Sequence, residues 1–164
     1  MSMVSCQWQS ELQQYKFTIR LINMQTTTKP TITIQTNVKA PVLKVWNYWT
    51  KPEHIIKWNQ ASDDWHTTRA ENDLRVGGRF LARMEAKDGS FGFDFGGIYD
   101  EVKENEYIEY TIGDGRKVKI IFTSQNDKTE IVETFEAENT NSLEMQRGGW
   151  QAILDNFKKY TEAN

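Results

Sequence analysis

The middle of the chain constrains the fold most, because it is a run of short, apolar-alternating segments separated by tight turn sequences. Strands are predicted near residues 65–71, 78–87, 91–103, 106–112, 116–125 and 129–137. The separators are rich in turn-forming residues, as in Asp88-Gly89-Ser90 and Gly113-Asp114-Gly115. Connections this short join antiparallel neighbours, since a parallel crossover needs about a dozen residues or more. The run therefore predicts one antiparallel sheet.

This sheet needs a covering layer, because several of its strands have one apolar face. The apolar sets are Phe91/Phe93/Phe95, Ile108/Tyr110/Ile112 and Val118/Ile120/Phe122. From Leu143 to Tyr160, apolar residues recur at spacings of three and four, which predicts a helix of roughly five turns. Asn141-Ser142 is its predicted N-cap. The C-terminal helix is therefore the predicted cover.

The segment that precedes these strands predicts one more strand and two short helices. Alternation from Ile32 to Val38 is typical of a half-buried strand. Ala40-Pro41 begins one predicted helix, and residues 52–58 form a second. The predicted class is α+β: a curved antiparallel sheet with two short helices and a long C-terminal helix that enclose an apolar cavity.

Residues 1–30 differ from the predicted domain, which spans residues 31–164. One helical stripe is formed by Trp8, Leu12, Tyr15 and Ile19, and a polar stretch ends at Pro30. The segment is either an extra helix that docks on the domain or on a second subunit, or a tail that is present only because the start of translation is assigned upstream of Met24. Cys6 has no histidine nearby in the sequence, so we do not expect it to be a nucleophile.

Composition excludes several classes of protein. The 20 basic and 23 acidic residues are mixed along the chain, so neither nucleic acid nor an anionic membrane is an expected partner. No apolar run approaches the roughly 20 residues of a membrane span, and no secretory signal is visible. One cysteine excludes an internal disulfide and a multi-thiolate metal site. We expect a soluble, cytoplasmic domain.

Several short motifs occur in an order that resembles the START-like (SRPBCC) superfamily. They are Ala40-Pro41 through Val45-Trp46, Pro52-Glu53-His54, Trp58, and Gly149-Trp150 with Leu154. More narrowly they resemble the homologues of the activator of heat-shock protein ninety ATPase. The segments 69–80 and 88–97 resemble a bacterial branch of that family. The resemblance covers residues 31 to about 161 and implies a helix-grip fold with a cavity between sheet and long helix.

The resemblance does not imply one activity, because the superfamily holds lipid carriers, hormone receptors and polyketide cyclases. The eukaryotic co-chaperone of the family also has an N-terminal domain that binds the chaperone. This chain has no room for that domain, so chaperone regulation is the weaker alternative.

Two carboxylates are candidates for chemistry. Glu133 shares strand parity with Ile131 and Phe135, which predicts a carboxyl group on an apolar face, where a raised pKa would suit a general acid or base. The alternatives are an ion pair with Arg83, or the opposite parity with Val132 inside. Asp94 is the second candidate. The glycines around it, Gly92, Gly96 and Gly97, are more typical of a bend or bulge than of a phosphate loop.

Histidine and glycine positions add two further hypotheses. His54 and His66 are the only histidines and lack metal-ligand spacing, so neither a metal nor another cofactor is predicted. His66 follows Trp65 on a strand and can point into the cavity. Gly148-Gly149 lies inside the predicted helix, where each glycine costs about 1 kcal/mol relative to alanine. This pair indicates either close helix–sheet packing or space beside Trp150 for a ligand.

The sequence favours a binding module over an enzyme, because it supplies apolar walls more clearly than catalytic groups. The expected partner is a small hydrophobic or amphipathic molecule, held for carriage or sensing. The predicted ligand-binding residues are Trp49, Trp58, His66, Phe80, Phe93, Tyr110, Phe122, Glu133, Trp150 and Phe157. The alternative is a cyclase or dehydratase in which Glu133 or Asp94 moves a proton on a ketone-bearing substrate. The N-terminal stripe and exposed edge strands leave a homodimer open.

Overall fold

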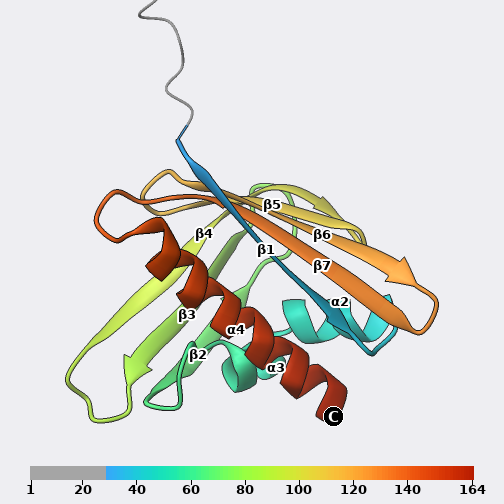
Figure 1. The fold of residues 1–164 in the computed structure, drawn as a ribbon, viewed down its shortest axis with the longest axis horizontal. Coiled ribbons are helices and arrows are strands. Elements are labelled where there is room, and N and C mark those ends of the chain that lie inside the picture. Colours follow the sequence, from blue (N-terminus) through green and yellow to red (C-terminus); the bar gives the residue numbers. More distant parts are fainter. Residues whose placement is uncertain (1–28) are drawn as a thin grey trace, which may run out of the picture.

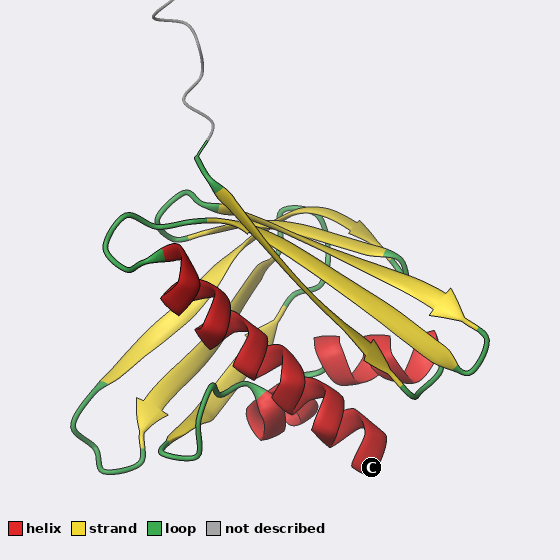
Figure 2. Ribbon diagram, in the orientation of Figure 1, coloured by secondary structure: helices red, strands yellow, loops and turns green. Residues whose placement is uncertain are grey.

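The computed structural model, which describes residues 29–164, shows a seven-stranded antiparallel sheet curled around a long helix (Figures 1 and 2). The elements in chain order are β1 (Thr31–Val38), α2 (Val42–Thr50), α3 (Pro52–Trp58), β2 (Trp65–Asn72), β3 (Arg79–Ala86), β4 (Gly92–Lys103), β5 (Tyr107–Ile112), β6 (Lys117–Gln125), β7 (Lys128–Glu136) and α4 (Leu143–Ala163). The strands lie in the order β1-β7-β6-β5-β4-β3-β2. The predicted α+β helix-grip architecture is confirmed.

The predicted bounds of the six strands β2 to β7 differ from the observed bounds by one residue at most. This agreement follows from the turn residues, which fix where each hairpin closes. Gly89 and Asn126 adopt the left-handed backbone conformation, with φ of 75° and 57°, as tight hairpin turns require. The predicted stripe near the N-terminus and Cys6 lie outside the described residues.

The sheet curls through two irregularities in its strand pairing. The register shifts between Thr67 and Arg69 on β2, and between Tyr99 and Glu101 on β4. The glycines of β4 serve close packing beside the second of these shifts. A Cβ atom at Gly97 would overlap the carbonyl oxygen of Thr111 on β5. The bulge that the glycines predict therefore lies a few residues beyond them on the same strand.

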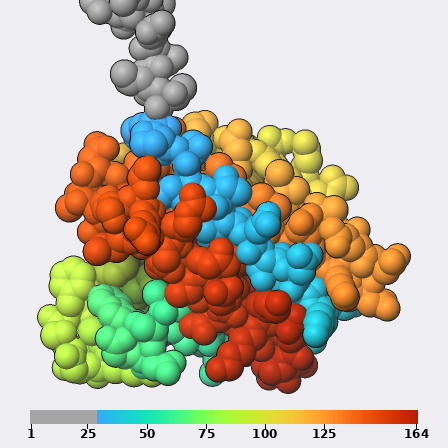
Figure 3. Space-filling model, viewed as in Figure 1, coloured from blue at the N-terminus to red at the C-terminus, as the bar shows by residue number. Residues whose placement is uncertain are grey.

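The long helix α4 contacts the sheet mainly at one edge. It packs on β1, whereas α3 packs on β2 at the opposite edge, and α2 and α3 both contact α4. Figure 3 shows α4 and β1 as one continuous surface on the face it presents. Ser142 caps the helix as predicted, since its side chain accepts a hydrogen bond from the backbone N–H of Met145 at 3.1 Å. Between these two edges no helix within residues 29–164 packs as closely on the sheet, so mainly side chains occupy the space above its inner face.

An aromatic cluster holds the helices together where they meet. The ring of Phe157 on α4 makes edge contacts with Trp49 and Trp58, at centroid distances of 4.7 and 4.9 Å. His54 on α3 stacks on Tyr48 and lies 2.8 Å, from Nδ1 to the hydroxyl, from Tyr160 on α4. The predicted ligand contact Phe157 is thus a packing residue between the three helices.

We expect Phe157→Ala to lower the free energy of unfolding by about 3 to 5 kcal/mol, because it removes a fully buried ring between helices. Phe91→Ala is the matched control: that ring is 62% exposed, so its removal should change stability by about 0.5 kcal/mol or less. Urea unfolding of both variants measures the difference. Equal effects would mean that the aromatic cluster does not hold α4.

Candidate functional site

A cavity of about 480 Å³ lies between α4 and the sheet, and side chains of both line it. Its walls come from the helices α2, α3 and α4, from the strands β2, β3, β4, β5 and β7, and from Arg116 in the turn before β6. Ala61, Ser62 and Phe93 line it and are exposed to solvent, so they mark its mouth. A cavity therefore lies where the predicted fold requires one.

Seven of the ten predicted ligand-binding residues line this cavity: Trp49, Trp58, Phe80, Phe93, Tyr110, Glu133 and Trp150. The ring of Trp150 stacks on Phe135 of β7, with the centroids 4.0 Å apart. Two others, Phe122 and Phe157, lie behind the wall and pack against Trp49. His66 is not among the lining residues, since Trp65, on the opposite face of β2, lines the cavity instead.

Other lining residues were missed by the sequence analysis, although strand parity carried a signal for them. Arg116 has the parity of Val118 and Ile120, and Tyr99 has the parity of Phe95. Each is a polar or amphipathic residue that continues an apolar face, and inward orientation follows from the period of two.

The two glycines of α4 occupy different positions. A Cβ atom at either glycine would meet no atom within 4 Å, so close helix–sheet packing does not explain the pair. Gly149 lines the cavity beside Trp150, whereas Gly148 is exposed. The missing side chain at Gly149 therefore leaves space in the cavity wall.

Glu133 is the most unusual polar group of the wall. It is 5% exposed and shares the inner face of β7 with Ile131 and Phe135, which confirms the predicted parity. Burial raises the pKa of its carboxyl group to about 8. The alternative ion pair with Arg83 is wrong, since Arg83 pairs with Glu85 and Asp94. At neutral pH the Glu133 carboxyl is therefore largely protonated.

Two tyrosines face the same cavity from the neighbouring strands. The Tyr99 hydroxyl donates a hydrogen bond to Asn72 Oδ1 at 2.8 Å. Burial raises the pKa of Tyr110 well above its usual value, and the charge of Glu133 raises it further. Tyr110 therefore keeps its proton, and its hydroxyl stays a hydrogen-bond donor.

The second candidate carboxylate, Asp94, lies elsewhere. Its side chain is 48% exposed and forms an ion pair with Arg83 at 3.5 Å. It is not among the lining residues of the cavity. Asp94 therefore belongs to a surface charge cluster with Arg83 and Glu85, where it meets solvent rather than the enclosed space.

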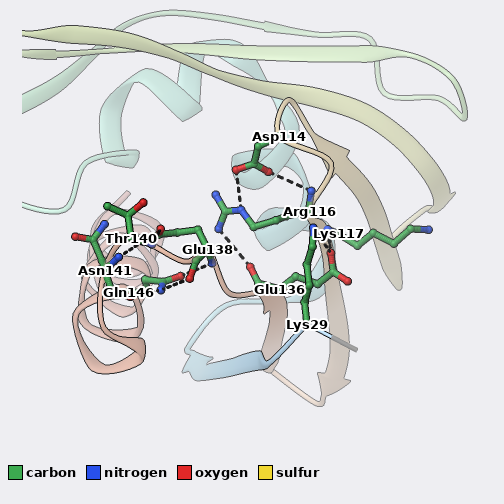
Figure 4. A network of polar contacts seen from close by, with 9 residues as sticks. All are labelled: Lys29, Asp114, Arg116, Lys117, Glu136, Glu138, Thr140, Asn141 and Gln146. Atoms are coloured by element: carbon green, nitrogen blue, oxygen red, sulfur yellow. Dashed lines mark hydrogen bonds and ion pairs between the residues drawn. The ribbon is translucent and has the colours of Figure 1, made fainter. Parts of the chain in front are cut away.

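Polar contacts surround Arg116, a lining residue of the cavity, and the start of α4 (Figure 4). The guanidinium group of Arg116 pairs with Asp114, with 2.8 Å between Nε and Oδ2, and donates to the carbonyl oxygen of Glu136 at 3.3 Å. Buried Gln146 donates to the carbonyl oxygens of Glu138 and Asn141. Burial raises the pKa of Asp114, but its hydrogen bonds and ion pair with Arg116 outweigh this and hold the pKa below its usual value.

Residues 29–164 have neither a cluster of metal ligands nor a membrane-spanning helix. No three His, Cys, Asp or Glu side chains in this part of the chain are grouped so that they hold a metal ion. Of its helices, none combines the length and the apolarity that crossing a bilayer needs.

Comparison with known proteins places the chain in a family. The family model described as "Activator of Hsp90 ATPase homolog 1-like protein" matches residues 39–162. The chain belongs to this family. The AHSA1-like protein from Aeromonas hydrophila, solved by NMR, is 45% identical with a TM-score of 0.78. A protein from Cytophaga hutchinsonii is 59% identical with a TM-score of 0.71. Each match covers 82% of this chain and 93% of the other.

More distant relatives share the fold alone. A protein from Chromobacterium violaceum is 22% identical with a TM-score of 0.74, covering 82% of this chain and 99% of that one. No curated protein matches the chain. Membership of the AHSA1-like family therefore accounts for the START-like architecture of the chain.

We expect the carboxyl group of Glu133 to make the folded protein less stable as the pH rises. The folded-state pKa, about 8, lies above the ordinary value near 4.5, so between these values the folded chain binds the extra proton. The free energy of unfolding should fall across this window, by at most about 5 kcal/mol. Glu133→Gln should remove that slope and be the more stable protein above pH 8.

Urea unfolding at about pH 5 and about pH 9 tests this expectation. Glu130→Gln, on the outer side of the same strand, is the matched control and should keep the wild-type slope. A slope unchanged by Glu133→Gln would contradict the raised pKa.

Proposed function

We propose that the protein binds a small, largely apolar molecule in its cavity, for carriage or sensing. The observation that carries the proposal is the cavity of about 480 Å³, open to solvent at its mouth, with mostly aromatic and aliphatic walls. Ligand pockets in proteins are of order 300 to 1,000 Å³ and combine apolar walls with a few convergent polar groups. The membership of the AHSA1-like family supports the same proposal through its fold.

The wall has an amphipathic character that suits an amphipathic ligand. Trp58, Phe80 and Trp150 present apolar rings, whereas Glu133 and Tyr110 place polar atoms among them. A ligand with an apolar body and one polar atom would bury its surface and still satisfy its hydrogen-bonding group. A purely apolar ligand would leave the polar wall groups without partners.

A proton-transfer enzyme is the second candidate, and the raised pKa of Glu133 favours it. A carboxyl group that titrates near pH 8 in an enclosed cavity exchanges a proton easily at physiological pH. A cyclase or dehydratase acting on a ketone-bearing substrate would use such a group. Chaperone regulation rests on the family description alone, and we do not propose it.

Gly149→Leu should weaken ligand binding at least tenfold without unfolding the protein. The new side chain enters open space in the cavity wall, so it fills the ligand's volume and also removes a helix-destabilising glycine. Gly148→Leu is the matched control, since its side chain meets only solvent. Titration with the neutral fluorescent probe phenylnaphthylamine should give an affinity at least tenfold weaker for Gly149→Leu only.

Native mass spectrometry of the gently purified protein tests the same proposal without a chosen probe. A reproducible extra mass that disappears on denaturation, and that Gly149→Leu lacks, would support binding. Equal probe affinities for the two leucine variants would place the ligand elsewhere.

Under the enzyme candidate, Glu133→Gln should abolish turnover of a carbonyl substrate and leave its affinity within a few fold, because the amide keeps the shape and loses the transferable proton. Steady-state kinetics with a panel of ketones measures both quantities. Turnover that survives the substitution would remove Glu133 from the mechanism.

A further inference from the structure

We infer that the polar end of the cavity selects a ligand with a neutral oxygen acceptor, a ketone, aldehyde or ester carbonyl, which accepts hydrogen bonds from Tyr110 and Glu133. This inference rests on the proposed function, because it names the chemical class that the same cavity would hold.

The two side chains lie on one face of the sheet, separated by a single strand. Tyr110 on β5 opposes Val118 on β6, and Val118 opposes Phe135 on β7. Glu133 is two residues from Phe135 along β7 and therefore shares its face. Both Tyr110 and Glu133 line the cavity. The two polar groups thus face the same space from either side of β6.

Neither group has a partner in the part of the chain that the structure describes. Within residues 29–164, no hydrogen bond or ion pair reaches the Tyr110 hydroxyl or the Glu133 carboxyl, whereas the neighbouring Tyr99 hydroxyl is bound to Asn72. The fully enclosed side-chain atoms without partners belong to other residues: Gln60, Asn105 and Thr161. The polar atoms of Tyr110 and Glu133 therefore keep accessible surface, and this surface faces the cavity that both residues line.

The protonation of the pair favours a neutral acceptor over an ion. Burial raises the pKa of both groups, so at neutral pH the wall presents two O–H donors. A carbonyl oxygen has two lone pairs and can accept both hydrogen bonds. The same pairing of a tyrosine with a protonated carboxyl group binds a carbonyl oxygen in ketosteroid isomerase.

Charged ligands fit this end of the cavity less well. An ammonium group would require Glu133 to ionise, and both ions would then be desolvated in an apolar wall. A carboxylate would require a cation, and the guanidinium group of Arg116 is already paired with Asp114 and the Glu136 carbonyl.

The other titratable or charged groups that line this space are Glu71 on β2, Tyr99 on β4 and Arg116 in the turn before β6. The side chains that β1 and α4 contribute near Glu133 are not titratable. The inward side chains of β1 beside Glu133 are Ile32, Ile34 and Thr36, and α4 presents Gly149, Trp150, Ile153 and Leu154. The complete set of titratable or charged lining residues is Glu71, Tyr99, Tyr110, Arg116 and Glu133.

The test compares four compounds that share an unbranched hydrocarbon skeleton of the same length: methyl nonyl ketone, undecane, undecylamine and undecanoic acid. The affinity of each compound is measured by its displacement of phenylnaphthylamine from the 164-residue protein. The buffers range from about pH 6 to about pH 9.5. We expect the ketone to bind most tightly below pH 8. Its affinity should fall at higher pH, since the ligand requires the protonated form of Glu133, which bound ketone stabilises.

Three variants separate the roles of the two donors. Tyr110→Phe should weaken ketone binding about threefold to tenfold and leave undecane binding unchanged, as loss of one hydrogen bond predicts. Glu133→Gln keeps an N–H donor at every pH, so its ketone affinity should no longer change with pH. Tyr107→Phe is the matched control, because that hydroxyl lies outside the cavity and donates to Glu109.

The outcomes distinguish this inference from the proposed function. Failure of the probe and of all four compounds to bind would overturn both. Binding of the ketone no tighter than undecane, with Tyr110→Phe unaffected, would overturn the inference and leave the binding function standing. Tightest binding of the amine, with affinity that rises with pH, or tightest binding of the acid, would also overturn it, in favour of an ionic partner.

Discussion

The burial of one wide apolar sheet face beneath one narrow helix is the constraint on which the rest of the structure depends. A helix with its side chains is about 10 Å across. Strands lie about 4.8 Å apart, so the seven strands form a surface roughly 30 Å wide before curling. The sheet therefore curls, and α4 packs on β1 while α3 packs on β2. The face between them remains uncovered by backbone, and large aromatic rings fill only part of it. The cavity is the volume that is left.

Features that weaken the empty protein gather on the wall of this cavity. Gly149 lowers helix propensity at a place where a larger side chain would meet no atom. Glu133 places a carboxyl group among apolar neighbours, and burial raises its pKa to about 8. The Tyr110 hydroxyl faces the same space. Local violations of folding rules are most often found at functional sites, where a ligand supplies the missing contacts. Their concentration around one cavity is the physical basis for the proposal that a ligand binds there.

Membership of the AHSA1-like family explains the scaffold and leaves the chemistry to individual side chains. In this chain the way the helices cover the sheet leaves a space between sheet and helix. What that space accepts depends on which residues point inward. In this chain three of the polar inward groups come from separate strands: Tyr99 from β4, Tyr110 from β5 and Glu133 from β7. Sequence-distant positions thus meet in one small volume.

The sequence by itself determined the elements, their bounds and the antiparallel pairing, because turn residues and a period of two are local signals. It also determined that Glu133 shares a face with Ile131 and Phe135, since parity within one strand is fixed by the backbone. Only the tertiary structure decided which aromatic rings line the cavity and which lie behind it, as Phe122 and Phe157 do. It also decided that Arg83 pairs with Asp94 on the surface rather than with Glu133. These outcomes depend on the curl of the sheet and on where α4 crosses it, which are properties of all the elements packed together.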